Sequence, residues 1–180
     1  MTGNTGLFNR RFASNFMPLP PLQVPAVGAI APDFTLPIIG GGHDVQSGNY
    51  RGKKPVVLAF TRIFTENLFC PYCYPHIQDL KQRYQEFKDR GAELLMISST
   101  DPVQSQEIVD QLILPYPFLY DPDCHIFRRY GVGQALGAPL PAQFIIDLSG
   151  RITFRHLFSF TDGNADTDTI LKELDRLADQ

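Results

Sequence analysis

The chain has 180 residues, which is enough for one domain with a real hydrophobic core. Hydrophobic residues make up 43% and charged residues 19%, as in an ordinary soluble globular protein. The formal net charge is −3 and the basic pairs are scattered, so we expect neither nucleic acid nor an anionic membrane as a partner.

The sequence also bounds the cellular compartment. No apolar run approaches the roughly 18 residues of a membrane span, and the N-terminus lacks the continuous apolar stretch of a signal peptide. Three cysteines are too few for a disulfide-stapled secreted scaffold, and a cysteine pair in an intracellular chain is more often catalytic or metal-binding. We therefore expect a cytoplasmic protein.

Residues 1–30 are expected to form an extended arm, because the prolines between Pro18 and Pro32 forbid a long helix or a central strand. The arm is nevertheless apolar at Phe8, Phe12 and Phe16. It is predicted to pack either on its own domain or on a second subunit, and the second arrangement would make a homodimer.

Residues 31–180 are expected to form one α/β domain, with a central mixed sheet flanked by helices on both faces. Bounded apolar runs predict strands at Phe34–Leu36, Pro55–Thr61, Ala92–Ser98, Phe118–Tyr120, Phe144–Asp147 and Ile152–Leu157. Apolar spacing and terminal signals predict helices over residues 71–90, from Pro102 to about Ile113, over residues 123–130 and around residues 170–177.

The most informative segment is Phe69-Cys70-Pro71-Tyr72-Cys73, which places two thiols three residues apart where a strand gives way to a helix. The free N–H groups and the dipole of a helix start favour a thiolate. Cys70 precedes the helix, whereas Cys73 lies on its buried stripe. We predict that Cys70 is the exposed nucleophile with a lowered pKa and that Cys73 is the shielded thiol that resolves the mixed disulfide. The alternative is a pair of inert core cysteines.

Three further residues are candidates for the site. His76 could join Cys70 and Cys73 as a zinc ligand, but such a row splays along a helix and lacks a fourth ligand, so we expect no metal and a solvated or supporting histidine. Cys124 is either an extra redox thiol or, more often at such a place, a partly buried structural cysteine. Thr65 could donate to a bound peroxide or could shape the loop, and both alternatives stay open.

Several segments together resemble a known family. They are Ala31–Leu36, Tyr50–Lys53, Pro55–Leu58, Gly91–Glu93, Ile97-Ser98, Asp121–Asp123, Tyr130–Val132 and Phe144–Asp147. In this order and spacing they resemble the thioredoxin-like superfamily, and within it the alkyl hydroperoxide reductase/thiol-specific antioxidant (AhpC/TSA, peroxiredoxin-like) branch. The resemblance covers roughly residues 31–177 and implies a thioredoxin-like fold.

Two departures from the peroxiredoxin pattern bear on activity. The family places a threonine three residues before its reactive cysteine, whereas Thr65 lies five residues before Cys70. The family also carries an arginine just before a later strand, where this chain has Pro141. The resemblance to thioredoxin-like proteins implies a cis Leu140–Pro141 bond, whose outward-turned backbone would position an extended substrate. The alternative is a trans proline, which is common at a strand start.

Three functions fit these residues. The first is a thiol–disulfide oxidoreductase that cycles Cys70 and Cys73 on a peroxiredoxin-like scaffold. The second is a thiol peroxidase in which Cys70 attacks a hydroperoxide and Cys73 resolves the sulfenic acid. The third is a non-catalytic redox-sensing domain. The resemblance implies a disulfide or peroxide substrate and a reductant of the thioredoxin or glutathione type, and we expect no cofactor beyond the cysteine pair.

Overall fold

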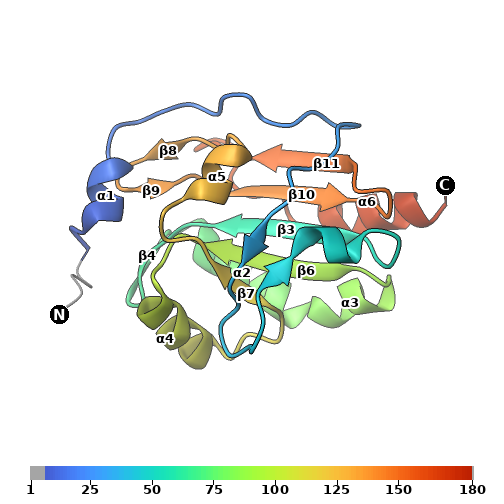
Figure 1. Cartoon of the computed structure of the whole chain (residues 1–180), viewed down its shortest axis with the longest axis horizontal. Helices are drawn as coiled ribbons and strands as arrows, with labels where there is room; N and C mark the ends of the chain where they lie inside the picture. The colour runs from blue at the N-terminus through green and yellow to red at the C-terminus, as the bar shows by residue number, and fades with distance from the viewer. Residues whose placement is uncertain (1–6, 180) are drawn as a thin grey trace.

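A computed structural model describes residues 7–179, and its centre is a five-stranded sheet of order β11-β10-β3-β6-β7 (Figure 1). The strands are β3 (Val56–Thr61), β6 (Glu93–Ser98), β7 (Phe118–Tyr120), β10 (Ala142–Ile146) and β11 (Ile152–Leu157). The first three run parallel, and β10 pairs antiparallel with both β3 and β11. The predicted mixed sheet is therefore confirmed.

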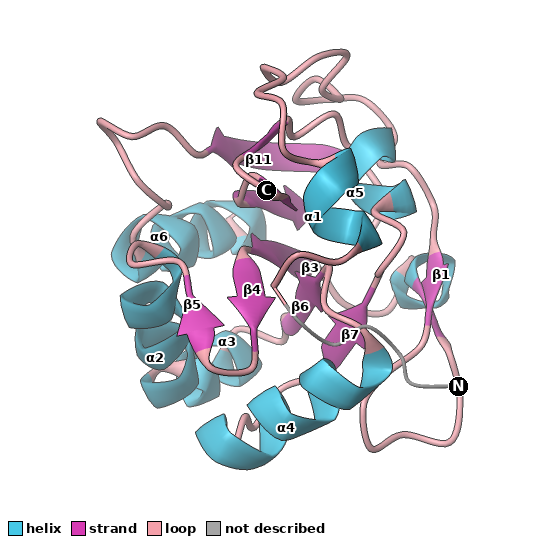
Figure 2. Cartoon of the chain, turned by 90° about the vertical axis from the view of Figure 1, so that its left-hand side faces the viewer, coloured by secondary structure: helices cyan, strands magenta, loops and turns pink. Residues whose placement is uncertain are grey.

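Each face of the sheet carries its own half of the core. Every residue of β3 is buried, and its side chains alternate, with Val57 and Ala59 facing one cluster and Leu58 and Phe60 facing the other. Figure 2 shows α2, α3 and α6 on one side of the sheet and α5 on the other, with the arm. Helices on both faces are therefore confirmed.

The remaining elements are short or lie at the edges. The helices are α1 (Arg10–Ser14), α2 (Cys73–Gln82), α3 (Tyr84–Asp89), α4 (Pro102–Leu112), α5 (His125–Arg129) and α6 (Thr167–Ala178), with a 3-10 turn η1 (Ser47–Tyr50). Two-stranded ribbons are formed by β1 (Thr35–Leu36) with β2 (Val45–Gln46), β4 (Ile63–Thr65) with β5 (Leu68–Phe69), and β8 (Gln134–Ala135) with β9 (Ala138–Pro139).

Two helix predictions need correction. The single helix predicted over residues 71–90 is two helices, because the chain leaves helical geometry at Arg83. The apolar stripe nevertheless continues across the break, with Ile77, Leu80 and Phe87 all buried. Ile113, predicted on the next helix, instead ends α4 in the left-handed conformation (φ 50°) and is exposed.

The described part of the arm, residues 7–30, packs on its own domain. It begins with α1, a five-residue helix that the sequence did not predict. The backbone groups of Leu19 and Gln134 then exchange two hydrogen bonds of 2.9 Å, and Ile30 forms a bridge with Arg151 beside β11 (Figure 1). The first six residues of the predicted arm lie outside the described part. No helix within residues 7–179 is both long and apolar enough to cross a bilayer.

Candidate active site

The two candidate thiols lie beyond the carboxyl end of β3. The chain leaves β3 at Thr61, turns through the β4–β5 ribbon and enters α2. The Cys70 carbonyl accepts hydrogen bonds from the N–H groups of Cys73 (3.0 Å) and Tyr74 (3.1 Å), which closes the first turn. Pro71 therefore lies at the start of the helix, where a backbone N–H group has no acceptor within the helix. This agrees with its predicted place at the helix start.

Cys70 lies next to exposed residues but is itself buried. The prediction that Cys70 is exposed is therefore wrong. Only 4% of its surface is accessible, whereas the adjoining Pro71 and Tyr72 are exposed. The predicted direction of its pKa agrees with the structure, because a hydrogen bond from the Cys73 thiol lowers the pKa of Cys70 to about 6. The N–H groups of Tyr72 and Cys73 and the positive charge of Arg62 act in the same direction, against burial.

Cys73 has the opposite character. It is 1% exposed, and its hydrogen bond to Cys70, its burial and the negative charge of Cys70 raise the pKa of Cys73 far above its ordinary value. Both cysteines are free in the structure, and the opposite shifts of their pKa values favour a thiolate at Cys70 and a protonated thiol at Cys73. The order of the two pKa values agrees with the sequence prediction, and the roles of nucleophile and resolving thiol stay predictions.

Arg62 is a member of the site that the sequence analysis missed. It follows β3, is only 3% exposed, and its guanidinium donates to the carbonyls of Ala135 and Leu136. Its Nε has no hydrogen-bond partner among the described residues. A buried arginine needs anionic or carbonyl partners. An arginine directly after a fully apolar strand could therefore have indicated a buried side chain with such partners.

Asn164 is the second residue that was missed. Its Nδ2 donates to the Tyr72 carbonyl (2.9 Å) and lies 4.0 Å from Cys73 Sγ. Its Oδ1 accepts from Gln143 Nε2 (3.0 Å), a buried side chain of β10. The loop before α6 therefore reaches back to the dithiol, which no local sequence pattern reveals.

The cis Leu140–Pro141 bond predicted from the resemblance is wrong, because no peptide bond in the described chain is cis. The backbone here is already engaged within the fold. The N–H of Leu140 donates to the Gly133 carbonyl (3.1 Å), and the carbonyl of Pro141 accepts from Phe158 (3.2 Å). These groups are not turned outward for a substrate, and both residues are buried. A substrate-positioning role for Leu140 and Pro141 stays a prediction.

The remaining predicted candidates lie apart from the sulfurs or are inaccessible. Thr65 Oγ1 accepts from the Asn67 N–H (3.3 Å) in the β4–β5 turn, as expected for a residue that shapes the loop. Cys124 is buried, and burial raises its pKa to about 11, in the manner of a structural cysteine. His76 is half-buried rather than solvated, and burial lowers its pKa to about 4. Within residues 7–179 no three His, Cys, Asp or Glu side chains are arranged to hold a metal ion.

Aromatic side chains border the dithiol. Tyr72 packs edge-on against Phe158 (5.3 Å between ring centroids), which in turn packs against Phe160 (5.3 Å). Tyr72 and Phe160 are among the exposed large apolar residues, as is Leu136 next to the carbonyl groups that hold Arg62. The reactive sulfur thus borders an apolar, partly exposed surface.

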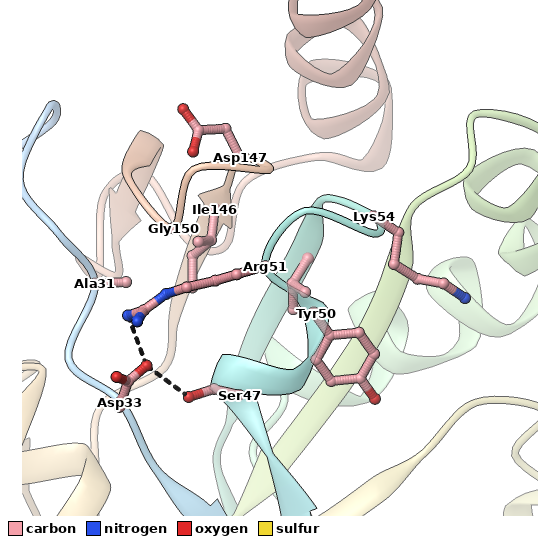
Figure 3. Close-up of a pocket in the computed structure, with 10 residues that line it drawn as sticks. Ala31, Asp33, Ser47, Tyr50, Arg51, Lys54, Ile146, Asp147 and Gly150 are labelled. Atoms are coloured by element: carbon pink, nitrogen blue, oxygen red, sulfur yellow. Dashed lines mark hydrogen bonds and ion pairs between the residues drawn. The ribbon is translucent and has the colours of Figure 1, made fainter.

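A pocket between residues 31–33 and the β10–β11 turn lies at the other end of the sheet (Figure 3). Arg51 and Ser47 point toward Asp33, and Arg51 donates to Asp33 over 2.7 Å. Its lining includes Ile146, which pairs with the first residue of β3, whereas the thiols follow the last. This pocket therefore takes no part in the dithiol chemistry.

Solved structures define the class of fold. The reduced 2-Cys peroxiredoxin of Plasmodium vivax matches with a TM-score of 0.74 and 23% identity, covering 85% of this chain and 82% of that chain. AhpC of Mycobacterium tuberculosis gives 0.72 and 24%, covering 86% and 94%. At these identities the likeness shows the fold alone, which is the thioredoxin-like fold of peroxiredoxins.

Sequence comparison gives the family. The model of the AhpC/TSA family matches residues 27–155, so the chain belongs to this family. The thiol-disulfide oxidoreductase ResA of Geobacillus kaustophilus is 31% identical over 128 residues, which are 71% of this chain and 67% of ResA. The chloroplastic peroxiredoxin Q of Gentiana triflora is 30% identical over 127 residues, which are 69% of this chain and 56% of that protein. The chain is a thiol-dependent redox enzyme on a peroxiredoxin-like scaffold, and it spans between half and two thirds of these two relatives.

Proposed function

We propose that the chain is a thiol–disulfide oxidoreductase in which Cys70 attacks a substrate disulfide and Cys73 completes the exchange. The observation that carries this proposal is the hydrogen-bonded pair itself, because the contact between the two thiols lowers the pKa of Cys70 and raises that of Cys73. With a pKa of about 6, roughly nine-tenths of Cys70 is ionised at pH 7. An attacking thiol whose pKa lies near the ambient pH reacts fastest in exchange.

The first step forms a mixed disulfide. The Cys70 thiolate attacks one substrate sulfur, the substrate S–S bond breaks, and the other substrate sulfur leaves as a thiolate that takes a proton from solvent. Cys70 thereby loses its negative charge. The hydrogen bond and the charge that raise the pKa of Cys73 disappear in the same step, so Cys73 becomes a stronger acid when it is needed.

The second step releases the reduced substrate. Cys73 loses its proton and attacks Cys70, the bond between Cys70 and the substrate breaks, and the second substrate sulfur leaves as a thiolate that is then protonated. Two electrons have moved from the dithiol to the substrate. The N–H of Arg62 and the Nδ2 of Asn164 both favour the Cys73 thiolate that this step requires. Within the protein only the sulfurs of Cys70 and Cys73 change oxidation state, and the substrate disulfide is the oxidant.

A thiol peroxidase is the second candidate, and Arg62 is the observation that favours it. The arginine expected in peroxiredoxins is replaced by Pro141, but Arg62 brings a buried guanidinium to the dithiol from another strand, with its Nε free to donate. The Cys70 thiolate would attack one peroxide oxygen and become a sulfenic acid, while the O–O bond breaks and the other oxygen leaves, takes a proton and is released as an alcohol or water. Attack by Cys73 would then give the disulfide and water.

One preparation of reduced protein tests both candidates. We expect reduction of insulin disulfides by the wild type and by Cys124→Ser, the matched control for a buried thiol. Cys70→Ser should lose at least ~100-fold in rate, since it lacks the nucleophile. Cys73→Ser should stop as a mixed disulfide detectable by mass spectrometry. Rapid hydroperoxide consumption without insulin reduction would replace the proposal by the peroxidase, and full turnover of Cys70→Ser would refute both.

The apolar border around Cys70 supports an extended or partly unfolded disulfide substrate rather than a small polar one. The reductant that restores the dithiol is proposed to be of the thioredoxin or glutathione type, as the family resemblance implies. The cytoplasmic location and a homodimer formed through the arm stay predictions.

A further inference from the structure

Arg62 keeps its place beside the dithiol through the β8–β9 ribbon. The acceptors of its guanidinium are the carbonyls of Ala135 and Leu136, both in this ribbon and its turn. An arginine side chain is long and flexible, so the position of these two carbonyls decides how close its charge stays to Cys70.

The ribbon is in turn held by the N-terminal arm. The N–H groups of Leu136 and Gly137 donate to the carbonyls of Phe16 and Asn15, each over 3.0 Å. Gly137 has a φ of +88°, and a Cβ at this position would overlap the Phe12 ring, so the arm lies directly on the turn. The turn that carries the acceptors of Arg62 is therefore fixed by α1 and the residues after it.

The arm also holds the backbone that follows Arg62. Arg11 of α1 is buried, and its guanidinium donates to the carbonyl of Ile63 (3.1 Å), to the carbonyl of Phe64 and to the hydroxyl of Ser99 (3.1 Å). These contacts fix the start of β4, directly after Arg62. The arm thus restrains Arg62 in two ways. It holds the backbone that follows Arg62, and it holds the turn whose carbonyls accept from the Arg62 guanidinium.

We propose that the N-terminal arm is a positioning element of the redox site, in which Arg11 and Phe12 hold Arg62 beside Cys70 and Cys73. Arg11 does not touch the sulfurs in this arrangement and acts through Arg62. The inference rests on the proposed role of Cys70 as the nucleophile. Its test needs no disulfide or peroxide, so a wrong substrate assignment and a wrong role for the arm give different results.

The test is a double-mutant cycle read as the pKa of Cys70, from iodoacetamide alkylation rates against pH in a Cys124→Ser background. Arg11→Ala should raise the pKa of Cys70 by about one unit, which lowers the alkylation rate at pH 6 about fivefold. In the Arg62→Ala background the same substitution should have no further effect, because coupled residues are not additive. Arg10→Ala removes an exposed neighbouring charge on the same helix and is the matched control.

Two further variants keep the test decisive. Arg11→Lys retains the charge but cannot reach all three acceptors, so it should restore less than half of the shift if position rather than charge matters. If Arg11→Ala does not fold, Phe12→Ala, at a half-buried site, should raise the pKa in the same direction. An unchanged pKa in folded variants, or an equal shift with and without Arg62, would overturn the proposal.

Discussion

At the scale of single residues, the chemistry depends on unequal environments for two identical side chains. Cys70 receives hydrogen bonds from the Cys73 thiol and from backbone N–H groups, whereas Cys73 faces the charge of Cys70 from a buried position. The difference between the pKa values of the two thiols lasts only while Cys70 is ionised. Groups that act on Cys73 alone therefore control the second step of exchange and leave the first unaffected.

Asn164 is such a group, because its Nδ2 lies 4.0 Å from Cys73 Sγ. A hydrogen bond to an ionised group is worth about 1.5–3 kcal/mol, and this one is long. Asn164→Ala should therefore slow the release of the mixed disulfide by about fivefold. Single-turnover kinetics with a fluorescent disulfide separate attack from release. Asn49→Ala, an exposed residue of η1, is the control. An equal loss in both steps would mean that Asn164 only supports the fold.

His76 should set the acid sensitivity of the fold. Its Nε2 is buried without a partner in the described part of the chain, and burial lowers its pKa from 6.5 to about 4. Between these values the unfolded chain binds a proton that the folded chain does not, so stability falls as the pH drops from 6.5 to 4. His76→Gln should remove up to about 3 kcal/mol of that fall in urea unfolding. His125→Gln, at an exposed histidine, is the control, and the same acid loss in both variants would contradict the assignment.

The sequence identified the two neighbouring sulfurs and the direction of the Cys70 pKa, because both follow from spacing and a helix start. The order in which the two thiols react stays a prediction. The sequence did not identify Arg62 or Asn164. Asn164 lies more than ninety positions from Cys73, and the acceptors of Arg62 are more than seventy positions away from it. Contacts over such separations depend on the folded arrangement, so one sequence does not show which groups meet. The only local signal was the place of Arg62 directly after a fully apolar strand.

At the scale of elements, the buried strands were predictable and the short elements were not. A run such as β3 is apolar on both faces, and a buried strand is the structure that such a run favours. Its place in the sheet therefore followed from composition. The helix α1 has only five residues and depends on the contacts of Arg11, which local propensity cannot supply. The break at Arg83 likewise leaves the apolar spacing intact, so the pattern alone reads as one helix.

Two aspartates that cap helices differ in burial. They should therefore differ in how much each contributes to the free energy of unfolding. Asp121 is 3% exposed and its carboxylate accepts from the N–H groups of His125, Ile126 and Phe127 at the start of α5. Asp101 caps α4 through one N–H group, that of Gln104.

Asp121→Ala should therefore lower the free energy of unfolding by about 2–3 kcal/mol, because it leaves buried donors unsatisfied. Asp101→Ala should lower it by about 1 kcal/mol, the usual value for an N-cap. Urea denaturation of the two variants at one pH measures the difference. Equal losses would mean that water replaces the Asp121 carboxylate.

At the scale of the whole molecule, the redox state is linked to folding stability through Cys70. A four-residue disulfide ring removes little entropy from the unfolded chain, about 2 kcal/mol on the loop-closure estimate. The reduced protein has a competing source of stability. The pKa of Cys70 is lowered to about 6 in the folded state, so between pH 6 and the free-thiol value the unfolded chain holds a proton that the folded chain has released.

The stability of the reduced form should therefore rise by about 1 kcal/mol per pH unit from pH 6 to about 8.5, and that of the oxidised form should lack this rise. We expect the oxidised form to be more stable at pH 6 and the two forms to become equal, or to exchange order, near pH 8. Urea unfolding of both forms at pH 6 and pH 8, in a Cys124→Ser background, measures the change. Cys70→Ser is the control that should show no rise. A constant difference between reduced and oxidised protein would mean that Cys70 is not ionised in the fold, and the proposed attack by its thiolate would then have no basis.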